Sequence, residues 1–176
     1  MRLYLGNMRE LIQLIDEMLR ANVVQSYAVF GALAQMRYTE AVVTMDADIL
    51  IGVEDDSIAV LSPVYAFCKD RGYLPEGEAI RVGAWPVQFI PAFDALSRDA
   101  MKHAELGDID GLAVRVVRAD YLAVMALKVG RAKDRLRILA LIESTAVQSV
   151  EIEKLAKQYQ LEDLWTKFKE RFLDED

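Results

Sequence analysis

Two aspartates, Asp46 and Asp48, stand two residues apart at the start of an apolar run that continues to Val53. Side chains two residues apart on a strand point to the same face of a sheet, because a strand repeats every two residues. An apolar strand rarely holds two unpaired carboxylates on one face unless a cation lies between them. The pair therefore either holds a divalent metal through oxygen ligands or lies on the solvent side of a strand start. Spacing alone favours the solvent-facing position.

The residues before this pair predict a strand, a tight turn and a helix. Residues 27–30 are expected to form a short buried strand, which Gly31 ends. A helix is expected over residues 32–36, and its N-terminal amides would face whatever lies at the end of the strand. The strand that carries Asp48 is expected over residues 48–53.

Apolar spacing predicts the remaining elements. An amphipathic helix is expected over residues 8–21, with Asn7 as its N-cap. Further strands are expected over residues 80–82, 86–90 and 112–117. Further helices are expected over residues 58–71, 96–105, 120–127, 135–142 and 162–172, with one more capped by Ser149. The order predicts an α+β protein with a core over residues 1–118 and a helical C-terminal subdomain over residues 119–176.

Composition narrows the classes of function. The 176-residue chain has a formal net charge of -7, which argues against binding nucleic acid through bulk electrostatics. A single cysteine, Cys68, excludes an intrachain disulfide and a zinc site built from cysteines. No apolar run approaches the roughly 20 residues that cross a bilayer. The expectation is a cytoplasmic protein without membrane association.

The order of three short motifs carries more information than any one of them. The turn Phe30-Gly31-Ala32 is followed by Thr44-Met45-Asp46-Ala47-Asp48, and later by the segment Lys128-Val129-Gly130-Arg131-Ala132-Lys133-Asp134. This order resembles the nucleotidyltransferase-fold superfamily, in particular the small bacterial proteins related to the AbiEii-type toxins. The resemblance covers residues 27–141 and implies a mixed β-sheet flanked by helices.

The resemblance also implies a chemistry for the acidic pair. Proteins of this kind transfer a nucleoside monophosphate from a nucleoside triphosphate to an acceptor. Asp46 and Asp48 would hold Mg²⁺, which neutralises charge on the triphosphate. Together with Lys128 they would be the catalytic residues. The acceptor is unidentified, with RNA and protein both open, and either a homo-oligomer or a cognate partner protein is expected.

The same resemblance assigns the nucleotide contacts. Gly31 and Ala32 would form the turn that approaches the phosphates. Lys128 would reach the triphosphate as a point charge, and Arg131 would clamp it with a planar fork. Lys133 and Asp134 are expected to be structural, since an acid is favoured where a helix opens.

Two positions depart from the superfamily pattern. Ala32 stands where glycine or serine is usual, and Gln88 stands where a third carboxylate is usual. A neutral amide can ligate a metal weakly but cannot take a proton at neutral pH. Asp94 and Glu78 are the acids nearest in sequence. The alternative to an active enzyme is a catalytically degenerate member of the fold that binds nucleotide or acts as a toxin-antitoxin-like interaction module.

Overall fold

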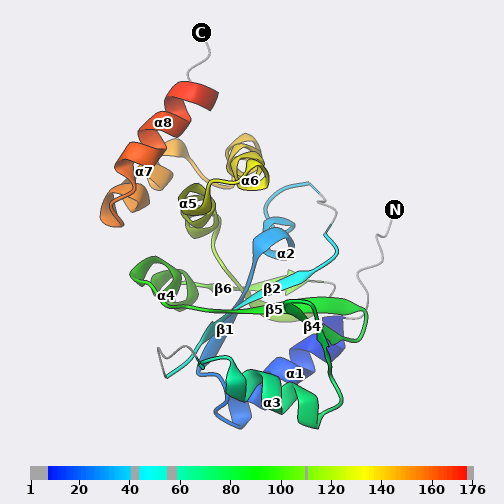
Figure 1. Cartoon of the computed structure of the whole chain (residues 1–176). Helices are drawn as coiled ribbons and strands as arrows, with labels where there is room; N and C mark the ends of the chain where they lie inside the picture. Colours follow the sequence, from blue (N-terminus) through cyan, green and yellow to red (C-terminus); the bar gives the residue numbers. More distant parts are fainter. Residues whose placement is uncertain (1–7, 41–43, 55–58, 110, 174–176) are drawn as a thin grey trace.

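The strands form one mixed sheet in the order β3-β4-β5-β2-β1-β7-β6 (Figure 1). The structure is a computed structural model that describes residues 8–40, 44–54, 59–109 and 111–173. The strands are β1 (Ser26–Phe30), β2 (Ala47–Gly52), β3 (Pro75–Glu76), β4 (Ala79–Val82), β5 (Trp85–Pro91), β6 (Glu105–Ile109) and β7 (Leu112–Val116). The central strands β5, β2 and β1 are mostly apolar, as expected for strands covered on both faces.

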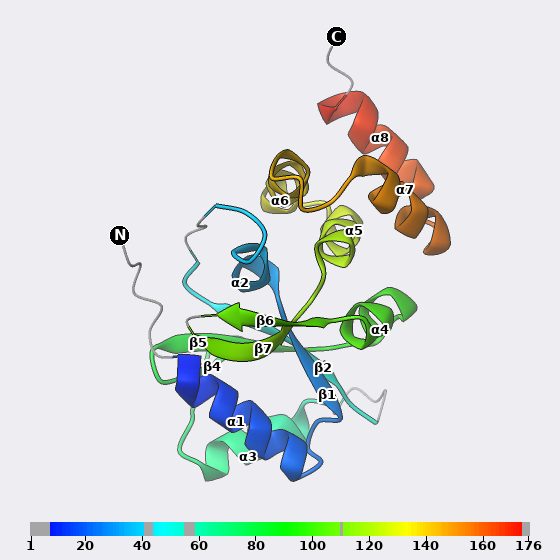
Figure 2. The same ribbon diagram turned by 180° about the vertical axis from the view of Figure 1, so that it is seen from behind.

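Helices cover both faces of this sheet (Figures 1 and 2). One face carries α1 and α3, and the other carries α2, α4 and α5. The remaining helices α6, α7 and α8 lie beyond, on the side of α5. The bounds are α1 (Met8–Arg20), α2 (Gly31–Gln35), α3 (Ser62–Asp70), α4 (Ala95–Lys102), α5 (Ala119–Val129), α6 (Ala132–Glu143), α7 (Ser149–Gln158) and α8 (Glu162–Phe172). The expected α+β architecture, a mixed sheet flanked by helices, is confirmed.

One cluster of buried apolar side chains joins the sheet to its helices. Leu11 and Met18 of α1 lie in it, as do Ile49 of β2, Leu122 of α5 and Trp165 of α8. Each of these side chains is almost completely excluded from solvent. The division into a core and a helical subdomain at residue 118 stays a prediction. Among the described helices, none has the length and hydropathy needed to span a membrane.

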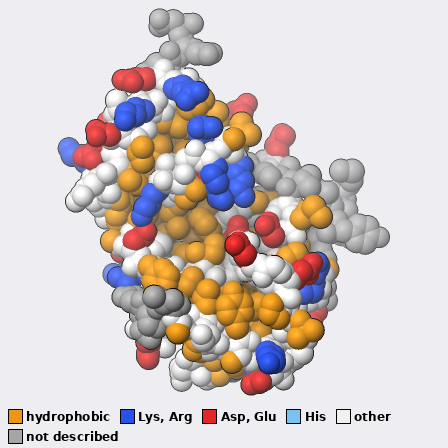
Figure 3. All heavy atoms as spheres, in the orientation of Figure 1, with side chains coloured by type: hydrophobic (Ala, Val, Ile, Leu, Met, Phe, Trp, Pro, Cys, Tyr) orange, Lys and Arg blue, Asp and Glu red, His pale blue; other side chains and the backbone are white. Residues whose placement is uncertain are grey.

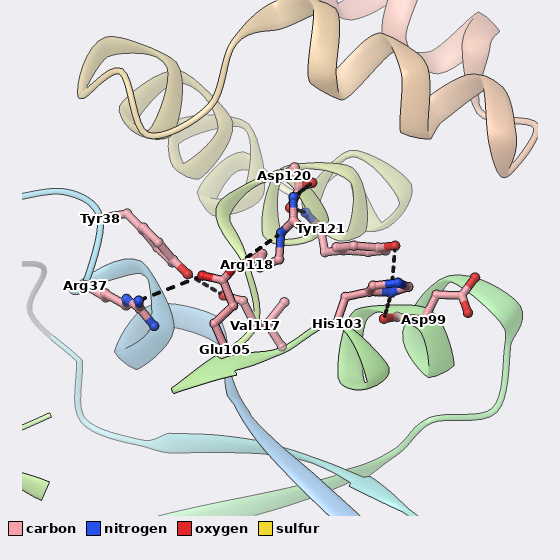
Figure 4. A network of polar contacts seen from close by, with 9 residues as sticks. All are labelled: Arg37, Tyr38, Asp99, His103, Glu105, Val117, Arg118, Asp120 and Tyr121. Atoms are coloured by element: carbon pink, nitrogen blue, oxygen red, sulfur yellow. Dashed lines mark hydrogen bonds and ion pairs between the residues drawn. The ribbon is translucent and has the colours of Figure 1, made fainter. Parts of the chain in front are cut away.

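Polar contacts surround the crossover from β7 to α5 (Figure 4). The Tyr38 hydroxyl donates to the Val117 carbonyl at 3.1 Å, which ties the segment after α2 to the crossover. Arg118 forms an ion pair with Asp120 at 2.9 Å and approaches Glu105 of β6 at 3.9 Å. The first turn of α5 is therefore held against both the sheet edge and the region of α2.

The helix expected over residues 96–105 was wrong at its C-terminal end. Helix α4 ends at Lys102, and residues 105–109 form the edge strand β6, which pairs antiparallel with β7. The Gly111 amide donates to Asp108 Oδ1 at 3.0 Å in the connecting turn. Local sequence is a weak guide here because β6 is mostly exposed and owes its conformation to pairing with β7.

Smaller differences concern element ends. Helix α7 has Gln148 rather than Ser149 at its N-cap. The backbone N–H of Gln148 donates to the Glu151 carboxylate at 2.7 Å. Strand β3, only two residues long, was not expected. The predicted N-cap Asn7 lies outside the described residues. Pro63 lies in the first turn of α3, where a helix tolerates proline.

Candidate active site

Asp48 lies at the centre of the sheet, between two strands that position it. In the register of the sheet it is opposite Gln88 of the parallel strand β5 and opposite Phe30 of the antiparallel strand β1. Lateral partners in a sheet point to the same face. Gln88 is therefore the side chain beside Asp48. Asp46 precedes β2 and is exposed, and its Oδ1 accepts a hydrogen bond from the Thr44 hydroxyl at 3.0 Å.

Gly31 makes room for the Asp48 carboxylate. Its φ of +63° lies in the left-handed region that favours glycine. A Cβ at this position would overlap Asp48 Oδ2, and the rest of the carboxylate would also be crowded. The glycine turn thus lets the carboxylate pack directly against the backbone between β1 and α2.

A cavity of about 640 Å³ opens above Asp48 between the sheet, α4 and the α5–α6 pair. Figure 3 shows acidic and basic side chains side by side near the middle of this face, with apolar surface beside them. The apolar lining comes from β1, β2, β5, α4 and α5 and from Phe93, which follows β5. The charged and amide side chains that line the cavity are Asp46, Asp48, Glu78, Gln88, Asp94, Lys128, Arg131, Lys133, Asp134 and Arg137.

Lys128 reaches one end of this cavity and is held there by Asp94. Its Nζ lies 2.6 Å from Asp94 Oδ2, and both side chains are about half exposed. Asp94 is also the N-cap of α4, where its Oδ1 accepts from the Ser97 amide at 2.7 Å. Burial raises the pKa of Asp94, but the hydrogen bonds from Lys128 and Ser97 outweigh burial and hold that pKa below its usual value.

Asp134 organises the other cationic side chains of the cavity. It is 1% exposed, in the first turn of α6. Its Oδ2 accepts from Arg131 Nε at 2.7 Å and its Oδ1 from Arg137 Nη1 at 3.3 Å. Gly130 makes this possible, because its left-handed conformation ends α5 and lets α6 begin two residues later. The expected structural role of Asp134 fits these contacts.

The electrostatic state of Asp48 follows from burial and from its neighbours. Burial raises the pKa of Asp48, and the charge of Asp46 adds to the rise. The rise in this pKa is opposed by three cations, which are, from strongest to weakest, Arg137, Lys133 and Arg131. The ionised pair Asp46 and Asp48 therefore lies in a setting where additional positive charge would be stabilising.

The donor set around Asp48 fits a hard cation. Asp46, Asp48 and the Gln88 amide offer only oxygen donors, which are the ligands that Mg²⁺ prefers. The open space that Gly31 leaves for the Asp48 carboxylate is consistent with a carboxylate positioned for a ligand. Among the described residues, no group of three or more His, Cys, Asp or Glu side chains could hold a metal ion. Gln88 is not one of these residue types, and its neutral amide oxygen would be a weaker third donor beside the two aspartates.

The structure brings four of the six predicted site residues to one cavity. Asp46, Asp48, Lys128 and Arg131 all contribute to its described lining, whereas Gly31 and Ala32 lie behind Asp48 and do not. Asp94 and Glu78 also line the cavity, although neither is on the strand position of Gln88.

Two further residues at the cavity are outside the six predicted site residues. Arg137 lines the cavity, and Gln35 of α2 contacts it from behind. Helical spacing could have identified Arg137, since residues three apart on a helix share a face and Arg137 follows Asp134 by three. No sequence signal marks Gln35, because its contact spans 102 residues.

Comparison with known proteins shows the class of fold. No protein-family model matches the chain, and no curated protein matches its sequence. The solution structure of the antibiotic-resistance factor ANT(2'')-Ia is similar, with a TM-score of 0.55, 13% identity, and coverage of 92% of this chain and 95% of that one. An antigenic nucleotidyltransferase-like protein from Paracoccidioides brasiliensis is similar, with a TM-score of 0.54, 14% identity and coverage of 94% and 93%. The chain has the fold of the nucleotidyltransferases.

Proposed function

We propose that this protein binds a nucleoside triphosphate with Mg²⁺ and transfers a nucleoside monophosphate to an acceptor. The observation that carries the proposal is the shared cavity. It combines the acidic pair of the β2 start with the cations of the α5–α6 turn in a volume of about 640 Å³, which is within the usual range for ligand sites. The nucleotidyltransferase fold supports the same class of reaction.

Two cations of the cavity would bind the triphosphate. Arg131 is 59% exposed although its Nε contacts Asp134, so its guanidinium is both oriented and accessible. Lys128 must leave Asp94 to reach a phosphate, and an exposed ion pair of this kind is cheap to break. Gly31 and Ala32 would act indirectly, by holding the Asp48 carboxylate in place. The apolar lining would take the base or the ribose.

Asp46 and Asp48 would hold the metal, with the Gln88 amide oxygen as a weak third donor. Mg²⁺ bound there would supply charge neutralisation for the phosphates during transfer. The acceptor oxygen would bond to the α-phosphorus while the bond to the bridging oxygen breaks and pyrophosphate leaves. The acceptor proton needs a base. Of the cavity acids not assigned to the metal, Asp94 and Asp134 are held in ion pairs and Glu78 forms none within the described residues, so we assign Glu78 this role.

A thermal-shift titration with each nucleoside triphosphate, with and without Mg²⁺, tests binding. A ligand stabilises the folded state by an amount set by its concentration relative to its dissociation constant. We expect metal-dependent stabilisation that is lost in Asp46→Ala. The absence of a shift with every nucleotide would contradict the proposal.

Incubation of labelled nucleotide with the protein and a cell extract tests transfer. Labelling of RNA or protein would support an enzyme and identify the class of acceptor. Binding without labelling would favour the degenerate alternative, a nucleotide-binding interaction module. We also propose that the protein is related to the AbiEii-type proteins. In the same proposal it assembles as a homo-oligomer or with a cognate partner protein.

A further inference from the structure

Arg137 is a buried cation whose position the nucleotide contacts above do not explain. It is 9% exposed and yet lines the cavity. Two elements hold it from behind: its Nε donates to Gln35 Oε1 of α2 at 3.1 Å, and its Nη1 donates to Asp134 at 3.3 Å. Within the described residues, Nη2 has no hydrogen-bond partner. A buried arginine is costly unless paired and hydrogen-bonded, so a guanidinium fixed in this way with one nitrogen unused is prepared for a ligand.

The charge balance around Asp134 points to an anionic ligand. This single carboxylate contacts both Arg131 and Arg137, so their direct ion pairs supply one negative charge for two positive ones, while Asp46 and Asp48 in the same cavity are assigned to the metal. The Gln35 amide that holds Arg137 is neutral. Lys133 lines the same cavity and adds a further positive charge. A planar guanidinium also matches the geometry of phosphate oxygens.

The place of Arg137 relative to Asp48 indicates which phosphate it would contact. Arg137 is hydrogen-bonded to Gln35 of α2, and α2 begins at Gly31, whose backbone packs against the Asp48 carboxylate. Lys128 lies at the Asp94 end of the cavity instead. Arg137 is thus the cation associated with the acidic pair, where the reacting phosphate must lie if these acids hold the metal.

We propose that Arg137 binds the transferred phosphate through Nη2, with Gln35 and Asp134 as the positioning residues that aim it. This inference rests on the proposed function for the identity of the ligand, but the phosphate-binding site itself can be tested without turnover. A purely structural Arg137 would balance Asp48 and Asp134 and would have no effect on phosphate affinity.

Calorimetric titration with inorganic tripolyphosphate and with ATP, in EDTA and in Mg²⁺, tests the site. Arg137→Gln removes the cation, and we expect both ligands to bind about tenfold or more weakly, as for loss of a charged hydrogen bond. Arg135→Gln is the matched control, because Arg135 is on the same helix but lines a separate groove beside α8. We expect this control to bind both ligands like the wild type.

The outcomes separate this inference from the proposed function. Tripolyphosphate binding that depends on Arg137, without any transfer activity, supports the phosphate site and counts against the enzyme. Transfer activity that survives unchanged in Arg137→Gln overturns the site and leaves the enzyme standing. Failure of the wild type to bind either ligand overturns both. If Arg137→Gln does not fold, Arg137→Lys decides: weaker binding than the wild type supports the site, and equal binding overturns it.

Discussion

Asp48 and Gln88 are register partners on the adjacent parallel strands β2 and β5. Gln88, which the resemblance assigns to the position of a third carboxylate, is thus beside the half-buried Asp48. The register thus places a neutral amide, and not a third carboxylate, next to Asp48. The consequences can be measured by substitution at either position.

Gln88→Asp should strengthen metal binding at the cost of stability without metal. A third carboxylate beside Asp46 and Asp48 adds like-charge repulsion, which a divalent cation would relieve. We expect a lower melting temperature in EDTA than for the wild type, and a larger rise when Mg²⁺ is added. Gln88→Asn keeps the shape of aspartate without its charge and should show neither effect. Equal Mg²⁺ responses of the Asp and Asn variants would count against a metal site at Asp48.

Gly31→Ala should destabilise the fold more than Gly72→Ala. Both glycines have positive φ, so each substitution carries a backbone cost of roughly 1–2 kcal/mol. Only at Gly31 would the new Cβ also meet the Asp48 carboxylate, since nothing lies within 4 Å of a Cβ at Gly72. Urea denaturation of the two variants would measure the difference. Equal losses would show that Gly31 is needed for its φ alone.

Asp48→Asn should stabilise the metal-free protein at neutral pH. Burial raises the pKa of Asp48 above its ordinary value of 3.8. The folded state therefore binds the proton more tightly than the unfolded chain, and stability falls as pH rises from 3.8 through the folded pKa. Asparagine has no proton to lose, so the variant should not lose stability in this way. It should be more stable than the wild type above the folded pKa of Asp48, and the difference should vanish below pH 3.8.

Denaturation curves from pH 3 to 8 would measure this advantage. The exposed Glu170 of α8 offers a control, and Glu170→Gln should show no comparable gain. An Asp48→Asn variant that is no more stable than the wild type at pH 7 would contradict a raised pKa of the half-buried Asp48 carboxyl.

Asp134→Asn should be strongly destabilising. The carboxylate is 2% exposed and holds both Arg131 and Arg137. Removing one partner of a buried ion pair typically costs about 3–5 kcal/mol, because the other charge stays buried. Glu17→Gln breaks the exposed pair with Arg71 and should cost roughly 0–1 kcal/mol. Chemical denaturation compares the two, and similar losses would mean that Asp134 contributes no more than a surface acid.

Much of the fold could be predicted because its patterns are local. The glycine turn after β1, the acidic pair before an apolar strand and the amphipathic α1 depend on neighbouring residues. Strand β6 could not be predicted in this way. Its residues are mostly exposed, and only pairing with β7 makes them a strand. Its identity is therefore decided by a partner in space rather than by its own composition.

The same distinction between local pattern and tertiary contact applies to the candidate site. Motif order alone predicted that Asp46, Asp48, Lys128 and Arg131 belong together, and all four line one cavity. It did not predict that Lys128 is paired with Asp94, because the two residues are 34 positions apart. Such contacts depend on how α4 packs against α5.

The sequence by itself determined the local groups of the candidate site, which are the two acids, the glycine turn beside them and the basic turn between α5 and α6. Tertiary structure alone decided which neighbours these groups meet. The register of β2 and β5 puts Gln88 beside Asp48, and the packing of α6 near α2 lets Gln35 hold Arg137. Periodicity places side chains on faces, but only packing of those faces sets the distances on which charge and hydrogen bonding depend.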